Sequence, residues 1–223
     1  MLDLHFFIGA LQHASTMKYQ LAIFDFDGTL ADSFPFFVEQ FNRLADRHRF
    51  ARIDPEDVHA YRHYTAAEMM KRVGLPRWKL PVVAASFISL MRENADSIPL
   101  FERVDDVLQH LSDAGIYLSV MSSNAEDNVV RVLGPANAGL IRHFDCGMSI
   151  FGKAARIRSL LQKTGIPPSK AIYIGDQLTD LEAARKEGIA FGAVAWGYGA
   201  IESFRKHAPE EEFNQVTDIK RIA

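Results

Sequence analysis

The sequence has a single cysteine, Cys146, and lacks both a long apolar run and an excess of charge of one sign. One cysteine cannot form an internal disulfide, so we expect a protein of a reducing compartment, the cytoplasm. No stretch approaches the roughly 20 apolar residues needed to cross a bilayer, so we expect no membrane partner. The 25 basic residues are balanced by 28 acidic ones, for a net charge of -3. The overall charge therefore gives no reason to expect binding to nucleic acid.

The residues that are present are those of a globular protein. The chain of 223 residues is 48% hydrophobic and 24% charged, a composition that excludes disordered and low-complexity classes. This length suits one large domain or a core with a smaller attachment.

Four apolar runs have the pattern of buried parallel strands, and each ends in residues that favour loops. They are residues 21–25, 117–122, 171–176 and 189–196. Helical patterns that end near Gly115, Gly134 and Gly165 separate the later runs. This alternation predicts an α/β fold with a doubly wound, Rossmann-like parallel sheet. Functional groups should gather at the carboxyl ends of its strands.

About 70 residues between the first two runs break this rhythm, because a crossover needs only a dozen or more. Their apolar residues recur at helical spacing. We interpret the segment as an inserted all-helical cap domain over the carboxyl ends of the strands. The predicted division gives residues 32–101 to the cap, and residues 1–31 and 102–223 to the α/β core.

Acidic residues end two of the predicted strands. Asp25 ends the first run and Asp27 follows it, and Asp176 ends the third run, with Asp180 one helical turn later. Neighbouring carboxylates raise one another's pKa unless a cation or a shared proton intervenes. A metal site with hard oxygen ligands is one interpretation of these acids. Turn formation or capping of a helix start is the alternative.

Polar residues also follow the second strand and precede a later helix. Ser122, Ser123 and Asn124 could bind an anion at the start of a helix, although an ordinary helix cap needs only one of them. Lys153 has the spacing of a P-loop lysine, but Ala154 stands where that loop requires Ser or Thr for magnesium. A nucleotide triphosphatase is therefore disfavoured.

Together these pieces resemble the haloacid dehalogenase superfamily, specifically its phosphoglycolate-phosphatase-like members with a helical cap. The signature is Asp25-Phe26-Asp27-Gly28-Thr29-Leu30, then Ser122, then Lys153, then Gly175-Asp176 with Asp180. The likeness covers residues 18–198 and places the glycine loop 196–199 beside the site. One departure concerns Lys153, which is followed by Ala154-Ala155 without the proline that is frequent there, so Arg156 or Arg158 could share its role.

The resemblance implies a role for each acidic residue. Asp25 is the expected nucleophile and forms an aspartyl-phosphate. Asp27 is the expected general acid for the leaving alcohol and later the base for water. Asp25, the main-chain carbonyl of Asp27, and Asp176 would bind Mg²⁺, with Asp180 orienting that group of ligands.

The remaining motif residues are expected to bind the phosphoryl group. Ser122 and Lys153 would neutralise its charge. The expected substrate-binding residues are Gly28, Thr29, Ser123 and Asn124.

The predicted function is a magnesium-dependent phosphatase for a small phosphorylated metabolite, acting as a monomer or homodimer. A phosphosugar mutase of the same superfamily is the alternative enzyme. A receiver-like or other non-catalytic phosphate-binding module is a further alternative, but a receiver needs neither a second acid at Asp27 nor a cap. Asp27 also argues against dehalogenation, which has no leaving alcohol to protonate. The sequence leaves the substrate open, because the cap would contact the leaving group.

Overall fold

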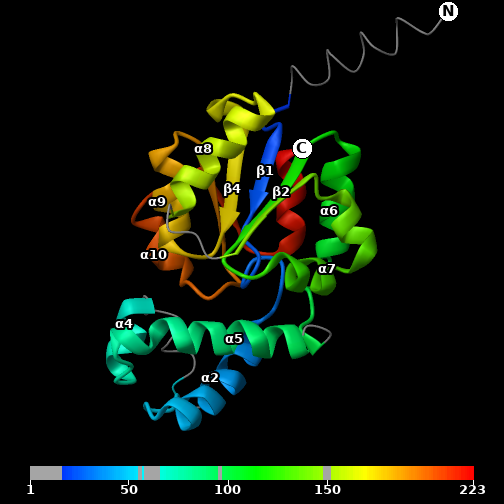
Figure 1. The fold of residues 1–223 in the computed structure, drawn as a ribbon. Coiled ribbons are helices and arrows are strands. Elements are labelled where there is room, and N and C mark those ends of the chain that lie inside the picture. Colours follow the sequence, from blue (N-terminus) through cyan, green and yellow to red (C-terminus); the bar gives the residue numbers. More distant parts are fainter. Residues whose placement is uncertain (1–16, 55–56, 58–65, 95–96, 148–151) are drawn as a thin grey trace, which may run out of the picture.

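The structure, a computed structural model, describes residues 17–54, 57, 66–94, 97–147 and 152–223. Its centre is a parallel sheet with the strand order β3-β2-β1-β4-β5-β6 (Figure 1). The strands are β1 (Leu21–Phe24), β2 (Tyr117–Ser122), β3 (His143–Cys146), β4 (Ala171–Gly175), β5 (Ala190–Val194) and β6 (Glu211–Phe213). The predicted doubly wound parallel sheet is confirmed.

Helices cover both faces of the sheet, which explains why its central strands are apolar throughout. Alternate residues of β1 enter two different apolar cores: Ala22 and Phe24 face one side, and Leu21 and Ile23 face the other. The first core includes α6 (Val104–Asp113), α7 (Glu126–Leu140) and the 3-10 helix η5 (Val216–Ile222). The second includes α8 (Gly152–Thr164), α9 (Leu178–Lys186) and α10 (Ile201–Arg205).

Some predicted boundaries shift in the structure. The helix expected to end at Gly134 continues to Leu140, but the backbone of Gly134 is not helical (φ 72°, ψ 163°), so α7 is two helical segments joined at a kink. A short 3-10 helix, η4 (Pro168–Lys170), precedes β4. The edge strands β3 and β6 were not predicted.

A second group of helices lies between β1 and α6 in the chain and beneath the carboxyl ends of the strands in Figure 1. It contains α2 (Phe34–His48), α4 (Ala66–Arg72), η2 (Arg77–Lys79) and α5 (Leu80–Asn94). The two connecting segments are hydrogen-bonded to each other. The N–H of Asp32 donates to the carbonyl of Pro99, and the N–H of Phe101 donates to the carbonyl of Leu30, both at 2.9 Å. The predicted division at residues 32 and 101 stays a prediction.

The helices of the described segments include none that is long and apolar enough to cross a membrane.

Candidate active site

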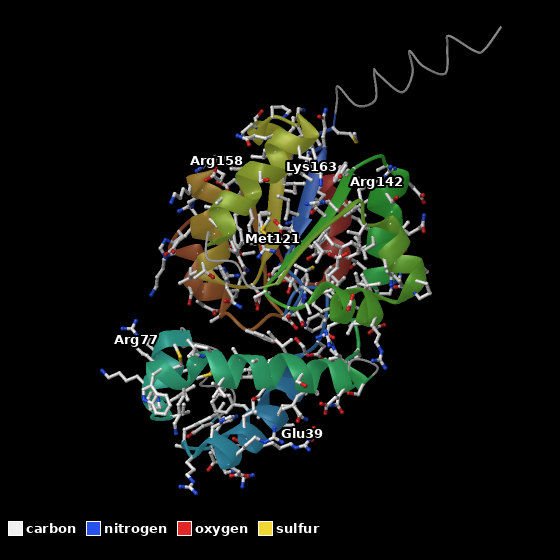
Figure 2. All side chains as sticks on the ribbon, viewed as in Figure 1. Glu39, Arg77, Met121, Arg142, Arg158 and Lys163 are labelled. Atoms are coloured by element: carbon white, nitrogen blue, oxygen red, sulfur yellow. The ribbon has the colours of Figure 1, made fainter. Side chains whose placement is uncertain are left out.

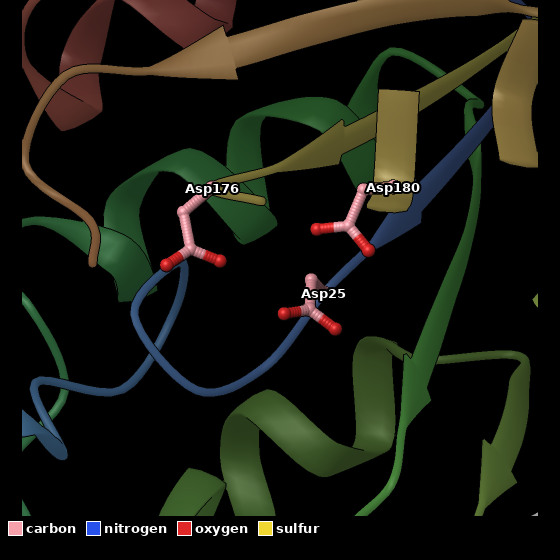
Figure 3. Close-up of side chains that lie close together, drawn as sticks. All are labelled: Asp25, Asp176 and Asp180. Carbon is pink, nitrogen blue, oxygen red and sulfur yellow. The ribbon is translucent and has the colours of Figure 1, made fainter. Parts of the chain in front are cut away.

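Three buried carboxylates meet at the carboxyl edge of the sheet (Figure 3). Asp25 follows β1, Asp176 follows β4, and Asp180 lies in the first turn of α9. Each offers an oxygen, and these oxygens lie within 4.8 Å of one another. The neighbouring strands β1 and β4 bring them together, because β1 pairs with β4 up to Phe24 and Ile174, and the N–H of Asp25 continues that pairing.

Asp176 has the environment of a metal ligand. It is fully buried, and its Oδ2 accepts a hydrogen bond from the N–H of Tyr198 at 2.7 Å. Its Oδ1 is one of the buried side-chain oxygens without a hydrogen-bond partner in the described part of the chain. Burial, with the charges of Asp25 and Asp180, raises the pKa of Asp176 well above its usual value. A divalent cation bound by carboxylate oxygens would relieve this repulsion, so the donor set fits Mg²⁺.

Two glycines allow the chain to approach Asp176 closely. Gly28 has a left-handed backbone (φ +82°), and a Cβ there would lie 2.4 Å from Asp176 Oδ2. A Cβ on Gly197 would lie 2.1 Å from the Cβ of Asp176. Larger residues at either position would displace this carboxylate.

Asp180 differs from Asp176 because both of its oxygens have partners. Oδ1 accepts a hydrogen bond from the ammonium of Lys153, and Oδ2 accepts one from the N–H of Gln177 at 3.1 Å. Burial raises the pKa of Asp180 to about 6, against the lowering effect of Lys153. Asp180 therefore positions Lys153 and caps the start of α9.

Lys153 supplies the positive charge beside Asp25. Its Nζ donates to Asp25 Oδ1 at 3.0 Å and also bonds Asp180. Burial lowers the pKa of Lys153, but the charges of Asp25 and Asp180 outweigh burial and hold that pKa well above its usual value. The side chain is therefore an ammonium group at neutral pH.

The two arginines that could share the role of Lys153 form ion pairs with other residues. Arg158 forms an ion pair with Glu187 at 2.7 Å and lies on the outer surface of the core (Figure 2). Arg156 forms an ion pair with Asp145 at 2.8 Å and donates to the main-chain carbonyl of Ser122 at 3.3 Å. Arg156 thus supports the loop after β2, and the structure brings Lys153 to Asp25.

Asp27 is not a member of the three-carboxylate cluster and is only partly buried. Its Oδ1 accepts a hydrogen bond from the hydroxyl of Ser33 at 2.8 Å. Loss of contact with water raises the pKa of Asp27 to about 6, and the charge of Asp25 adds to this rise. Hydrogen bonds from Ser33 and Asn124 oppose it. A carboxyl group with this pKa can donate and accept a proton near neutral pH.

The loop after β2 presents polar groups in fixed positions. Ser122 is buried, and its Oγ accepts a hydrogen bond from the N–H of Asn124 at 3.0 Å. Asn124 Oδ1 accepts from the N–H of Ala125 at 2.9 Å and from the Asn128 amide at 3.0 Å. The Ser122 hydroxyl proton remains able to donate to a phosphoryl oxygen. Ser123 is exposed.

The predicted substrate-binding pair Gly28 and Thr29 forms the turn after Asp27. Thr29 is fully buried, and its carbonyl accepts a hydrogen bond from the indole N–H of Trp196 at 3.1 Å. This bond ties the turn to the loop after β5.

Two side chains at the site had no role assigned from the sequence, Ser33 and Tyr198. Their hydroxyl groups are hydrogen-bonded to each other although the residues are 165 positions apart. A serine before a helix suggests an ordinary cap. The sequence around either residue therefore carries no signal for their pairing.

Known proteins resemble this chain in sequence and in fold. Residues 22–194 match the family model described as haloacid dehalogenase-like hydrolase. The phosphoglycolate phosphatase of Synechococcus elongatus is 31% identical over 204 residues, which cover 90% of this chain and 95% of that protein. The tyrosine-protein kinase PtkA of Mycobacterium tuberculosis is 29% identical over 196 residues, which cover 84% of this chain and 66% of that protein.

A solved structure with a similar fold is a haloacid dehalogenase-like family hydrolase from Streptococcus pneumoniae. The two chains superpose with a TM-score of 0.78 at 20% identity, over 91% of this chain and 97% of the other.

Proposed function

Because the chain belongs to the haloacid dehalogenase-like hydrolases, we propose that it hydrolyses the phosphomonoester of a small metabolite through a phosphorylated Asp25, with Mg²⁺. The family and the phosphatase activity predicted from the sequence are confirmed, and the chain is a phosphatase of this family. The metabolite, the covalent intermediate and the metal are the proposed part. The observation that carries the proposal is the contact of Lys153 with Asp25 at the edge of the buried carboxylate cluster.

The first step transfers the phosphoryl group to the protein. An Asp25 carboxylate oxygen attacks phosphorus while the bond from phosphorus to the leaving oxygen breaks. Asp27 gives its proton to that oxygen, so the substrate departs as an alcohol. Lys153 and the Ser122 hydroxyl stabilise the negative charge on the phosphoryl oxygens.

The second step returns Asp25 to its free form. Asp27, now a carboxylate, accepts a proton from water as the water oxygen attacks phosphorus and the bond between phosphorus and Asp25 breaks. Inorganic phosphate leaves. The pKa of about 6 for Asp27 suits both directions of proton transfer near neutral pH.

The residues that would hold Mg²⁺ are Asp25, the main-chain carbonyl of Asp27, and Asp176. Asp176 Oδ1 lacks a partner among the described residues, whereas both oxygens of Asp180 are hydrogen-bonded, and this contrast supports Asp176 as the ligand. When bound, Mg²⁺ would neutralise charge on the transferring phosphoryl group.

The test is a panel of phosphorylated metabolites with Mg²⁺, including 2-phosphoglycolate, sugar phosphates and inorganic pyrophosphate, with release of inorganic phosphate as the readout. We expect release from at least one small monoester without a bisphosphate activator. Dependence on such an activator without net phosphate release would instead indicate a mutase. Asp25→Asn should be inactive, whereas Asp113→Asn, an exposed aspartate on α6, is the matched control. No phosphate release from any compound, or an active Asp25→Asn, would contradict the proposal.

A further inference from the structure

We propose that Ser33 and Tyr198 are positioning residues that orient Asp27 through a chain of hydrogen bonds. The inference rests on the proposed function, because it assumes that Asp27 protonates the leaving group. The Ser33 hydroxyl donates to Asp27 Oδ1 at 2.8 Å and is also hydrogen-bonded to the Tyr198 hydroxyl. Each residue comes from a different segment: the turn after β1, the start of α2, and the loop after β5.

Ser33 does not act as a helix cap, although it lies at the N-cap position of α2. A serine at this position ordinarily accepts a hydrogen bond from a backbone N–H of the first helical turn. Ser33 makes no such bond, and its backbone already has helical angles (φ -89°, ψ -2°). Pro35, in the first turn, has no N–H to offer. The buried Ser33 hydroxyl is instead directed to Asp27.

When Asp27 is ionised, the number of hydroxyl protons determines which group donates in each hydrogen bond between Tyr198, Ser33 and Asp27. A hydroxyl has one proton. Since Ser33 donates to Asp27, the Tyr198 hydroxyl must donate to Ser33. Tyr198 therefore fixes the Ser33 hydroxyl in the orientation that holds Asp27, and it acts on Asp27 only through Ser33.

Tyr198 is itself fixed on two sides. Its backbone N–H donates to Asp176 Oδ2 at 2.7 Å, which places it beside the carboxylate cluster. Its ring packs against two aromatic side chains of α2, with centroid distances of 5.1 Å to Phe34 and 6.5 Å to Phe37. The orientation of Asp27 is thus tied to the carboxylate cluster and to the first helix beneath the sheet.

The test compares two substrates that differ in their need for a general acid. One is the best alkyl phosphomonoester of the panel. The other is 4-nitrophenyl phosphate, whose leaving group departs with little protonation. For Ser33→Ala we expect kcat to fall about 10- to 100-fold on the alkyl substrate and less than about threefold on the aryl one, with similar KM values.

Tyr198→Phe keeps the aromatic packing and removes only the hydroxyl. We expect a smaller loss in the same direction, about three- to tenfold on the alkyl substrate. In the double variant Ser33→Ala/Tyr198→Phe, the loss should equal that of Ser33→Ala alone, because Tyr198 acts through Ser33.

Two further variants separate positioning from folding. Ser33→Thr retains a hydroxyl and should restore the wild-type ratio of the two activities. Ser119→Ala removes another buried serine hydroxyl, which donates to the carbonyl of His143 at 3.0 Å, and should leave that ratio unchanged. Melting temperatures of all variants show whether each is folded.

Equal losses on both substrates in Ser33→Ala, or additive losses in the double variant, would overturn the inference while leaving the proposed function intact. If the wild-type protein hydrolyses no phosphomonoester, the proposed function fails, and the inference fails with it.

Discussion

Replacing Lys153 by methionine tests the balance of charge at the site. The change removes the ammonium group that bonds Asp25 and Asp180. It leaves three carboxylates with oxygens within 4.8 Å of one another. Methionine is also long and flexible, so the lost charge is the main effect and the lost packing is minor.

The magnitude follows from burial. Removing one partner of a buried ion pair costs about 3–5 kcal/mol. The Lys153 side chain is 22% exposed, and Asp180, whose pKa is raised by burial to about 6, can take up a proton when the ammonium is gone. Both effects reduce the expected cost to about 2–3 kcal/mol. For a chain of this size, the melting temperature should fall by about 4–12 °C.

The assay is thermal unfolding in chelator, followed by phosphate release with Mg²⁺. Activity should fall about 100- to 1000-fold, because a charge that stabilises the transferring phosphoryl group is lost. Lys163→Met, an exposed lysine on α8 (Figure 2), is the matched control and should change stability by less than about 0.5 kcal/mol. A Lys153→Met protein with wild-type stability and activity within fivefold would refute the role of Lys153.

Three further predictions concern the nucleophile, the metal and the single cysteine. Asp25→Asn should abolish phosphate release, because an amide cannot attack phosphorus. Calorimetry should show a melting temperature within a few degrees of the wild type, because the amide keeps the shape and Lys153 keeps its bond to Asp180. Chelation should stop activity, and Mg²⁺ should restore it better than Ca²⁺ in the phosphate-release assay, because Mg²⁺ enforces a tighter octahedral shell. Burial raises the pKa of the Cys146 thiol to about 12, so the thiol stays protonated below that pH. Alkylation by iodoacetamide at pH 8, followed by mass spectrometry, should therefore be at least about 100-fold slower than for a free cysteine. Equally fast labelling of the folded and unfolded chains would contradict this.

The central strands could be predicted because they are buried on both faces. Burial of Ala22 and Phe24 in one core and of Leu21 and Ile23 in the other requires a continuous apolar run, which the sequence shows directly. The edge strand β3 lacks this signal, since each of its residues is only partly buried.

The edge strand β6 has even less of a sequence signal. Its Glu211 and Glu212 belong to an acidic run, and only Phe213 is buried. The structure explains these acids by their partners: Glu211 pairs with Arg221 at 3.1 Å, and Glu212 pairs with Arg205 at 3.1 Å. Ion pairs of this kind at the surface can stabilise an edge strand that has one covered face. Their partners lie elsewhere in the chain, so no local sequence pattern predicts the strand.

Some residues of the site could also be predicted from the sequence, whereas others depend on contacts between distant parts of the chain. Asp25 and Asp176 could be expected to converge, because parallel strands end at one edge of the sheet. The place of Lys153 beside them was expected only from the resemblance to the family. The roles of Ser33 and Tyr198 depend on a contact across 165 positions of the chain. A single sequence, without a structure, offers no way to find that contact.

Gly28 and Gly197 belong to common loop sequences, but each is required by a contact with Asp176, which is distant in the chain from Gly28. An Asp-Gly pair suggests a turn, and Gly197 suggests only a flexible loop. In the structure both glycines lie next to Asp176. A Cβ on Gly28 would lie 2.4 Å from its Oδ2, and a Cβ on Gly197 would lie 2.1 Å from its Cβ. The Gly28 backbone is left-handed as a turn requires, so conformation and close approach both demand glycine there. The conformation could be inferred from the sequence, but the carboxylate that both glycines must accommodate is visible only when strands β1, β4 and β5 are brought together.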